Sequence, residues 1–178
     1  GMDTHKETIS IAYAEAGCAD PPVYLGVIRN RLAEVDAVIR RLHSKAATLE
    51  FVYEAGPTGY GLYRHLAAKG YRCLVAAPSL TPRRVGDKVK TDRRNACDLS
   101  RLLRSGDLTG IWVPAVEDEA IRDVSRARDA TRNGLKRAKQ RLKSFLLRLG
   151  LPYTGRAAWT PAHRRYLAKV VCPTPAQQ

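Results

Sequence analysis

The chain has 178 residues, and its 31 Lys and Arg against 17 Asp and Glu give a formal charge of +14 at pH 7. A composition of 44% hydrophobic and 27% charged residues indicates one globular domain, with or without an appendage, and excludes collagenous and low-complexity chains. No stretch approaches the roughly 20 apolar residues of a membrane span. The excess positive charge therefore favours nucleic acid as the partner, ahead of an anionic membrane surface.

The first 78 residues have the patterns of an α/β domain. Apolar runs, alternating or continuous, predict four strands, over Thr8–Ala14, Val23–Arg29, Leu49–Ala55 and Tyr71–Ala77. Apolar residues spaced by three and four predict two helices among them, from Leu32 to Leu42 and from Thr58 to Lys69. This order, with strands first in a meander and then separated by helices, predicts a mixed sheet.

Basic residues crowd the segment that follows Pro78, from Ser79 to Arg104. A helix is expected to begin near Asp92, and its leucines are expected to face the core. Gly110–Val113 is expected to form a short strand before Pro114.

The segment from Glu117 to Leu149 has no proline and predicts one long helix. Its residues at three- and four-residue spacing form an imperfect heptad seam: Ile121, Val124, Arg128, Thr131, Leu135, Ala138, Leu142, Phe145 and Leu149. The segment between Ala130 and Gly150 contains seven Lys and Arg and no acidic residue. We expect a basic coiled-coil-like arm, with packing against the chain's own domain as the alternative. A short helix is expected around Thr160–Val171.

The cysteines are widely spaced and form no CxxC pair: Cys18, Cys73, Cys97 and Cys172. This spacing argues against a zinc knuckle and a disulfide framework. The start of the chain has no apolar segment typical of a secretory signal. Reduced thiols in a cytoplasmic protein are therefore expected.

Three carboxylates occupy positions where chemistry is plausible. Asp3 comes just before the first predicted strand, Glu54 ends a strand ahead of Gly56-Pro57, and Asp92 starts a helix in a basic stretch. Ligands of open α/β sheets gather at the carboxyl ends of strands, and Mg²⁺ prefers a few carboxylates with water and phosphate oxygens. The structural alternative is that these acids cap turns and helices. His5, beside Asp3, would orient a ligand or a phosphate, or simply be exposed.

Four segments resemble the DEDD transposases, the bridge-RNA-guided recombinases of insertion sequences that have a RuvC-like N-terminal domain. The segments are GMDTHKETISIAYA, YEAGPTGYGLYRHL, PSLTPRRVGDKVKTDRRNACDLSRLL and WTPAHRRYL. The resemblance implies an α/β, RNase H-like fold: a five-stranded mixed sheet with flanking helices, followed by the helical arm. It implies a catalytic domain at 1–115, a basic arm at 116–150 for dimerisation and nucleic-acid binding, and at 151–178 a linker and the start of a C-terminal serine domain that the chain lacks.

The resemblance also implies a metal site for Mg²⁺ or Mn²⁺. Its four positions fall on Asp3, Glu54, Asp92 and Asn95, and the family has an aspartate at the last of them. Asparagine keeps one acceptor oxygen but lacks the negative charge, so weaker metal binding is expected. Asp98, one turn further along the predicted helix, is an alternative ligand. The first strand is expected to be short or clipped.

The implied activity is Mg²⁺-dependent DNA strand cleavage and transfer in transposition, in a bacterial cytoplasm and together with the serine domain. DNA, a guide RNA and further copies of the chain, joined through the arm, are the implied partners. The basic residues implied in nucleic-acid binding are Arg83, Arg84, Lys88, Lys90, Arg93, Arg94, Arg132, Lys136, Arg137, Lys139, Arg141 and Lys143.

Three other functions compete with this one. A stand-alone RuvC-like nuclease for Holliday junctions would share the acids and need no serine domain. A non-catalytic nucleic-acid-binding module would explain Asn95 as the mark of an inactive site. An ATPase with the same core would need a glycine-rich phosphate loop, where the chain has Thr4-His5-Lys6.

Overall fold

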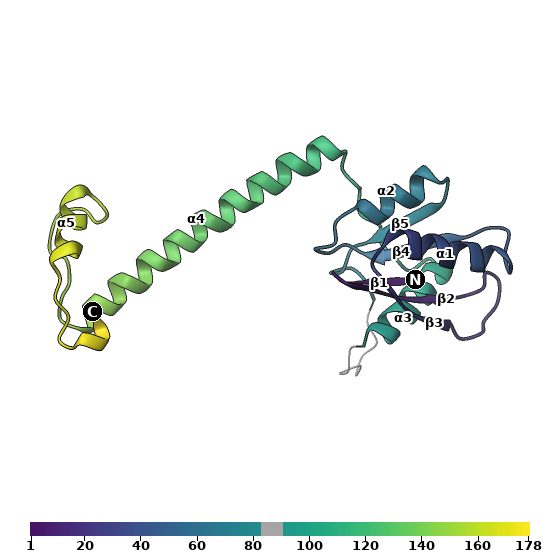
Figure 1. The fold of residues 1–178 in the computed structure, drawn as a ribbon, viewed down its shortest axis with the longest axis horizontal. Coiled ribbons are helices and arrows are strands. Elements are labelled where there is room, and N and C mark those ends of the chain that lie inside the picture. Colours follow the sequence, from purple (N-terminus) through teal and green to yellow (C-terminus); the bar gives the residue numbers. More distant parts are fainter. Residues whose placement is uncertain (83–90) are drawn as a thin grey trace. The chain divides into compact units, whose positions relative to one another are not determined.

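The computed structural model describes residues 1–82 and 91–178 (Figure 1). They form two compact units, Gly1–Val113 and Pro114–Gln178. The expected division into 1–115, 116–150 and 151–178 stays a prediction, and the two units are described separately.

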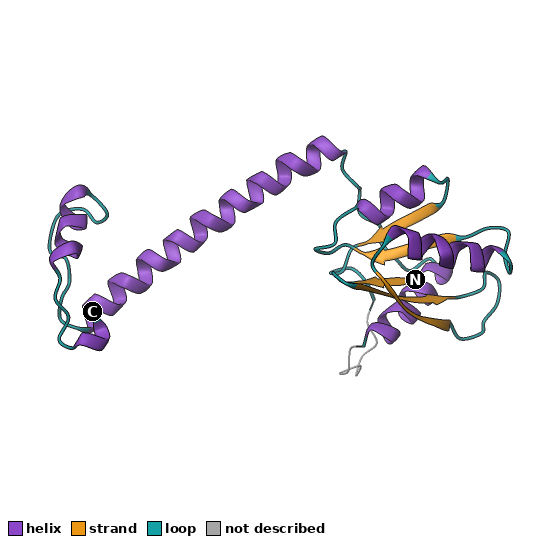
Figure 2. Ribbon diagram, viewed as in Figure 1, coloured by secondary structure: helices purple, strands orange, loops and turns teal. Residues whose placement is uncertain are grey.

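The first unit is built on a five-stranded sheet, drawn in orange in Figure 2. Its strands are β1 (Met2–Thr4), β2 (Thr8–Tyr13), β3 (Val23–Arg29), β4 (Glu50–Glu54) and β5 (Arg72–Ala76), in the spatial order β3-β2-β1-β4-β5. The first three strands pair antiparallel, whereas β1, β4 and β5 pair parallel. The predicted mixed α/β sheet is confirmed, and its architecture is consistent with an RNase H-like fold.

Two details of the sheet differ from the sequence-based prediction. β1 was not predicted from a pattern, because three residues are too few to show an alternation. The strand predicted at Gly110–Val113 is wrong: Gly110 forms only an isolated antiparallel bridge with Ala76.

Helices cover both faces of the sheet. On one face, α1 (Leu32–His43) and α2 (Gly61–Ala68) bury Val35, Ile39 and Leu66 against Met2, Ile9, Ile11, Phe51, Tyr53 and Val75. On the other face, α3 (Asp92–Ser105) packs Leu99 against Val52 and Ala76. Successive side chains of a strand point to opposite faces, so the two cores share the same strands.

This alternation determines which way Asp3 points. Met2 belongs to the core under α1 and α2, so its neighbour Asp3 faces α3. Gly1 lies directly against α3, since a Cβ atom there would overlap the backbone of Ala96 and Ser100. The close approach of β1 to α3 brings Asp3 to the first turns of that helix.

Asp36 links α1 to α2 through two ion pairs. Its carboxylate lies 2.8 Å from Nε2 of His65 and 3.0 Å from Nζ of Lys69. The hydrogen bonds from His65 and then Lys69 lower the pKa of this carboxyl group.

We therefore expect Asp36 to make stability depend on pH. With a folded pKa below the unfolded value, its contribution is present above the unfolded pKa and is lost as the pH falls through the folded pKa. Between about pH 5 and pH 2, the melting temperature of Asp36→Asn should fall less steeply than that of the unaltered chain. Parallel melting curves over that range would contradict this account.

The second unit contains one long helix and a shorter one. α4 (Val116–Arg148) has 33 residues, and α5 (Pro161–Lys169) and a 3-10 turn (Pro175–Gln177) follow. Ile121, Val124 and Leu135 of the heptad seam are exposed. A coiled-coil partner would cover such side chains, and the coiled coil stays a prediction. Among the described helices, none is long and apolar enough to cross a membrane.

The four cysteines are free and partly buried. Cys73 of β5 packs against the core beneath α1 and α2, and burial raises the pKa of its thiol to about 12. Burial also raises the pKa of Cys97 in α3. Such protonated thiols are poor nucleophiles and poor metal ligands, and the reduced state of the four cysteines stays a prediction.

Candidate metal centre and basic surfaces

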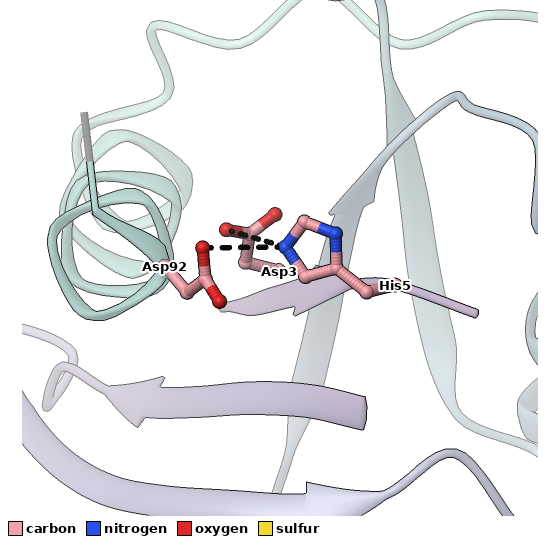
Figure 3. Close-up of side chains that lie close together, drawn as sticks. All are labelled: Asp3, His5 and Asp92. Carbon is pink, nitrogen blue, oxygen red and sulfur yellow. Dashed lines mark ion pairs between the residues drawn. The ribbon is translucent and has the colours of Figure 1, made fainter. Parts of the chain in front are cut away.

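Two carboxylates and an imidazole meet where β1 approaches the start of α3 (Figure 3). Nε2 of His5 lies 3.6 Å from Oδ2 of Asp3 and 3.3 Å from Oδ1 of Asp92. One ligand atom from each of the three residues lies within 4.8 Å of the others. This spacing suits a shared cation.

Local structure fixes each of these side chains. Thr91 caps α3 by accepting a hydrogen bond from the Arg94 amide, which places Asp92 in the first turn. The backbone N–H of His5 donates to the Thr8 carbonyl at 2.8 Å, and the Asn30 side chain donates to the His5 carbonyl at 2.7 Å. The turn between β1 and β2 therefore holds the imidazole next to the carboxylates.

Asn95 lies one turn along α3 from Asp92 and donates from Nδ2 to Oδ2 of Asp3 at 2.8 Å. This hydrogen bond orients the Asp3 carboxylate. It also directs an N–H toward the centre, where an aspartate would present a second oxygen. Asp98, the alternative ligand, instead lies 3.6 Å from Arg101. It is not a member of the group formed by Asp3, His5 and Asp92.

The exposure of the three groups is uneven. The Asp3 side chain is 13% exposed, whereas those of His5 and Asp92 are 50% and 57% exposed. A cation here would have one shielded ligand and two open ones. The open side leaves room for water and phosphate oxygens, which Mg²⁺ retains in most protein sites.

Glu54, the fourth predicted ligand, ends the strand next to β1. The parallel register pairs Met2 with Tyr53, so Asp3 and Glu54 each come one residue later, at the carboxyl ends of neighbouring strands. Equivalent residues of parallel strands point to the same face, which here is the α3 face. Among the described residues, Glu54 is not within the group of atoms formed by Asp3, His5 and Asp92.

Two basic residues, Arg93 and Arg94, lie in the first turn of α3, next to the candidate metal centre. The guanidinium of Arg93 lies over the Tyr24 ring, 5.3 Å from its centroid, and Arg94 follows it in the first turn of the helix. Four other residues predicted to bind nucleic acid lie outside the described residues: Arg83, Arg84, Lys88 and Lys90.

The predicted basic residues of α4 fall on two neighbouring strips of that helix. Four of them line a groove of about 380 Å³ whose wall includes Trp159: Arg132, Lys136, Lys139 and Lys143. Arg137 and Arg141 line an adjacent groove together with Arg148. The sequence-based prediction missed Trp159 and Arg148. The available signal for Trp159 was its position within a basic segment. For Arg148 it was the spacing of seven residues from Arg141, which places both on the same side of the helix.

Comparison with known proteins decides the family. A family model described as a transposase, of the DEDD type and IS110 class, matches residues 1–150. The chain belongs to the DEDD transposases of the IS110 type. It is 42% identical over 178 residues to a protein of Sinorhizobium fredii (strain NBRC 101917 / NGR234) that is named as a transposase, y4qE. It is also 42% identical over 172 residues to the transposase for insertion sequence element IS1533 of Leptospira borgpetersenii.

The alignments cover 100% and 94% of this transposase chain but 46% and 49% of the two relatives. The chain thus spans about half the length of the curated relatives it matches. No solved structure gives a significant match.

Proposed function

We propose that this transposase chain is the metal-binding part of an enzyme that cleaves and transfers DNA strands during transposition. The observation that carries the proposal is the meeting of Asp3, His5 and Asp92 at the carboxyl end of the central strand β1, in a chain from this family. Glu54, from the neighbouring parallel strand, and Asn95 would complete the ligand set. A serine-bearing domain elsewhere in the longer protein would take part in strand exchange.

The residues present fit a divalent cation such as Mg²⁺ or Mn²⁺. Two carboxylates supply hard oxygen donors, and a nitrogen donor from His5 is more typical of Mn²⁺ and other transition metals than of Mg²⁺. The bound ion would polarise a phosphate oxygen and stabilise the charge that develops during phosphodiester cleavage.

The protein groups around the ligands would position the DNA. The hydrogen bond from Asn95 holds the Asp3 carboxylate in one orientation. Arg93 and Arg94 would bind phosphates of the scissile strand, and the N-terminal end of α3 adds a favourable dipole for an anion. The half-exposed His5 and Asp92 leave the centre open to such a strand.

We extend the proposal to the partners of the longer protein. DNA and a guide RNA would bind the basic faces of α3 and α4. The exposed apolar side chains of the heptad seam would pair two copies of the chain in a coiled coil. Each of these partners requires its own test.

Asn95 favours a second candidate, a nucleic-acid-binding module without metal chemistry. Its amide donates to the Asp3 oxygen that a metal would need, so the centre is already satisfied by a hydrogen bond and by His5. This module would bind nucleic acid equally well with and without a divalent cation.

Titration of Mn²⁺ into the chain by calorimetry tests the metal site. Asp92→Asn and Asp98→Asn form a matched pair, because both remove one charge from α3 and only Asp92 lies within the group. We expect Asp92→Asn to weaken Mn²⁺ binding about tenfold or more, and Asp98→Asn to leave it nearly unchanged.

Two outcomes would contradict the metal site. If the unaltered chain binds no Mn²⁺ but binds DNA with the same affinity in EDTA, the nucleic-acid-binding module is the better description. If Asp92→Asn and Asp98→Asn weaken Mn²⁺ binding equally, the effect comes from general charge and not from ligation.

A further inference from the structure

The groove beside α4 combines positive charge with an aromatic wall. Arg132, Lys136, Lys139 and Lys143 occur at intervals of four, three and four residues, which places them on one side of the helix. At a rise of 1.5 Å per residue they extend over about 16 Å. No acidic residue of the described chain lines the groove. Trp159, from the segment before α5, forms its wall.

The Trp159 ring is held in place on several sides. Its backbone N–H donates to Nδ1 of His163 at 2.8 Å, and its ring meets the His163 ring edge-on at a centroid distance of 4.9 Å. His163 is 1% exposed and also contacts the rings of Tyr153 and Tyr166. The buried His163, packed between the half-buried Tyr153 and Tyr166, thus supports a partly exposed indole.

The backbone at Trp159 adds a second, independent observation. Its φ angle is +69°, and it is the only non-glycine residue of the described chain with positive φ. For a bulky residue this conformation is strained and persists only where the surroundings enforce it. The strained residue is the one that presents its ring to the cations, since Nζ of Lys139 lies 5.1 Å from the ring centroid.

We propose that this groove binds a segment of single-stranded nucleic acid, with a base stacked on Trp159 and phosphates on the lysines and Arg132. The face of the indole that attracts the Lys139 ammonium can stack equally well on a flat base. The ammonium displaced by the base would then be free to bind the adjacent phosphate. Duplex bases are already stacked and cannot reach the ring. The inference rests on the proposed function only in that the transposase must bind nucleic acid, and it needs no metal.

The fluorescence of Trp159 gives a direct readout. The chain has two tryptophans, and Trp112→Phe leaves Trp159 as the only one. Trp112 is 70% exposed and belongs to the first unit, so this substitution leaves the groove intact. Titration with a short oligodeoxyuridylate or oligouridylate, which differ only in the sugar, should quench the emission, because a stacked base quenches indole. A duplex of the same length should bind through charge with little quenching.

Affinity separates stacking from charge. Trp159→Ala should weaken binding of the single strand about 5- to 150-fold, while Trp159→Phe should retain most of the affinity. Trp112→Ala, which removes the other tryptophan, is the matched control and should change nothing. Circular dichroism of each variant checks that α4 and α5 are still folded.

Charge has its own signature in the salt dependence. Lys139→Gln and Lys143→Gln should each lower the slope of log affinity against log salt by about 0.7, the value for one phosphate of a single strand. Equal quenching by the DNA and RNA probes indicates that the groove does not distinguish deoxyribose from ribose. Stronger quenching by oligouridylate indicates that the 2′-hydroxyl is recognised and that a guide RNA is the natural ligand.

Absence of quenching by both single strands, or equal affinity of Trp159→Ala and the unaltered chain, would overturn the groove proposal. The metal site would be unaffected by that result. Conversely, Asp3→Asn should leave the quenching unchanged. If the unaltered chain shows the quenching but binds no Mn²⁺, that result would count against the proposed catalysis alone.

Discussion

Replacing Asp3 with asparagine is expected to abolish divalent-ion binding and leave the fold intact. Asp3 is the most shielded of the three converging side chains and makes contact with both His5 and Asn95. A unit charge at ~4 Å is worth about 4 kcal/mol at an effective dielectric constant of 20, or roughly 1,000-fold in affinity. Asparagine has the same size and can still accept the hydrogen bond from Asn95.

The measurement is a Mn²⁺ titration by calorimetry, combined with thermal unfolding in EDTA. The unaltered chain should gain melting temperature when Mn²⁺ is added, since a ligand that binds only the folded state stabilises it, and Asp3→Asn should gain none. In EDTA the two chains should melt at similar temperatures. Asp20→Asn is a suitable control, because Asp20 lies in the exposed turn between β2 and β3 and contacts Cys18. Undiminished Mn²⁺ binding by Asp3→Asn would exclude Asp3 as a ligand.

The sheet and helices were predictable where the chain is long enough to show a period. The boundaries of β3 agree with the prediction, and β2, β4 and β5 agree within a residue or two. β1 has only three residues, and what makes it a strand is pairing with β2 and β4. Gly110–Val113 has an apolar pattern, but Gly110 meets β5 at only one bridge. Pairing with strands distant in the sequence determines whether each of these two segments forms a strand, and a local sequence pattern holds no information about that pairing.

The candidate site was predictable to a different degree at each residue. From the residues alone, a frayed end for Asp3 and a helix cap for Asp92 are the favoured interpretations, and only the family resemblance implies that the two acids share a metal site. The structure brings them to the same edge through the close packing of Gly1 on α3. The place of His5 depends on the turn fixed by Thr8 and Asn30, which no spacing rule describes.

The placement of the Trp159 ring is not predictable from the sequence, although a tryptophan within a basic segment is a signal that the residue itself deserves a test. Its ring is positioned by a positive φ angle and by the buried His163, and both are properties of the folded second unit. The lysines opposite were predicted from their clustering on the helix, because their periodicity is local. The basic residues of the groove are therefore predictable from the sequence of α4, whereas its aromatic wall is not.

Asn95→Asp is expected to tighten Mn²⁺ binding by at least about tenfold. The substitution removes the amide N–H that points at Asp3 and adds a carboxylate one turn from Asp92. The added charge attracts a divalent ion strongly, and part of that gain is lost because the carboxylate must approach Asp3 at hydrogen-bonding distance. Without metal the same repulsion should lower the melting temperature. Mn²⁺ should restore it, because binding to the folded state offsets the repulsion.

Calorimetry and thermal unfolding, each with and without Mn²⁺, measure both effects in one variant. Asp98→Asn serves as the control for charge on α3, and Glu54→Gln in the Asn95→Asp background shows whether the neighbouring strand supplies a ligand. Loss of the tightening in that double variant would place Glu54 in the site, because its carboxylate leaves the α3 face of β4 while Asp3 and Asp92 remain. If Asn95→Asp lowers stability and Mn²⁺ restores none of it, the carboxylates repel one another without enclosing an ion. The start of α3 would then act in nucleic-acid binding and not in metal chemistry.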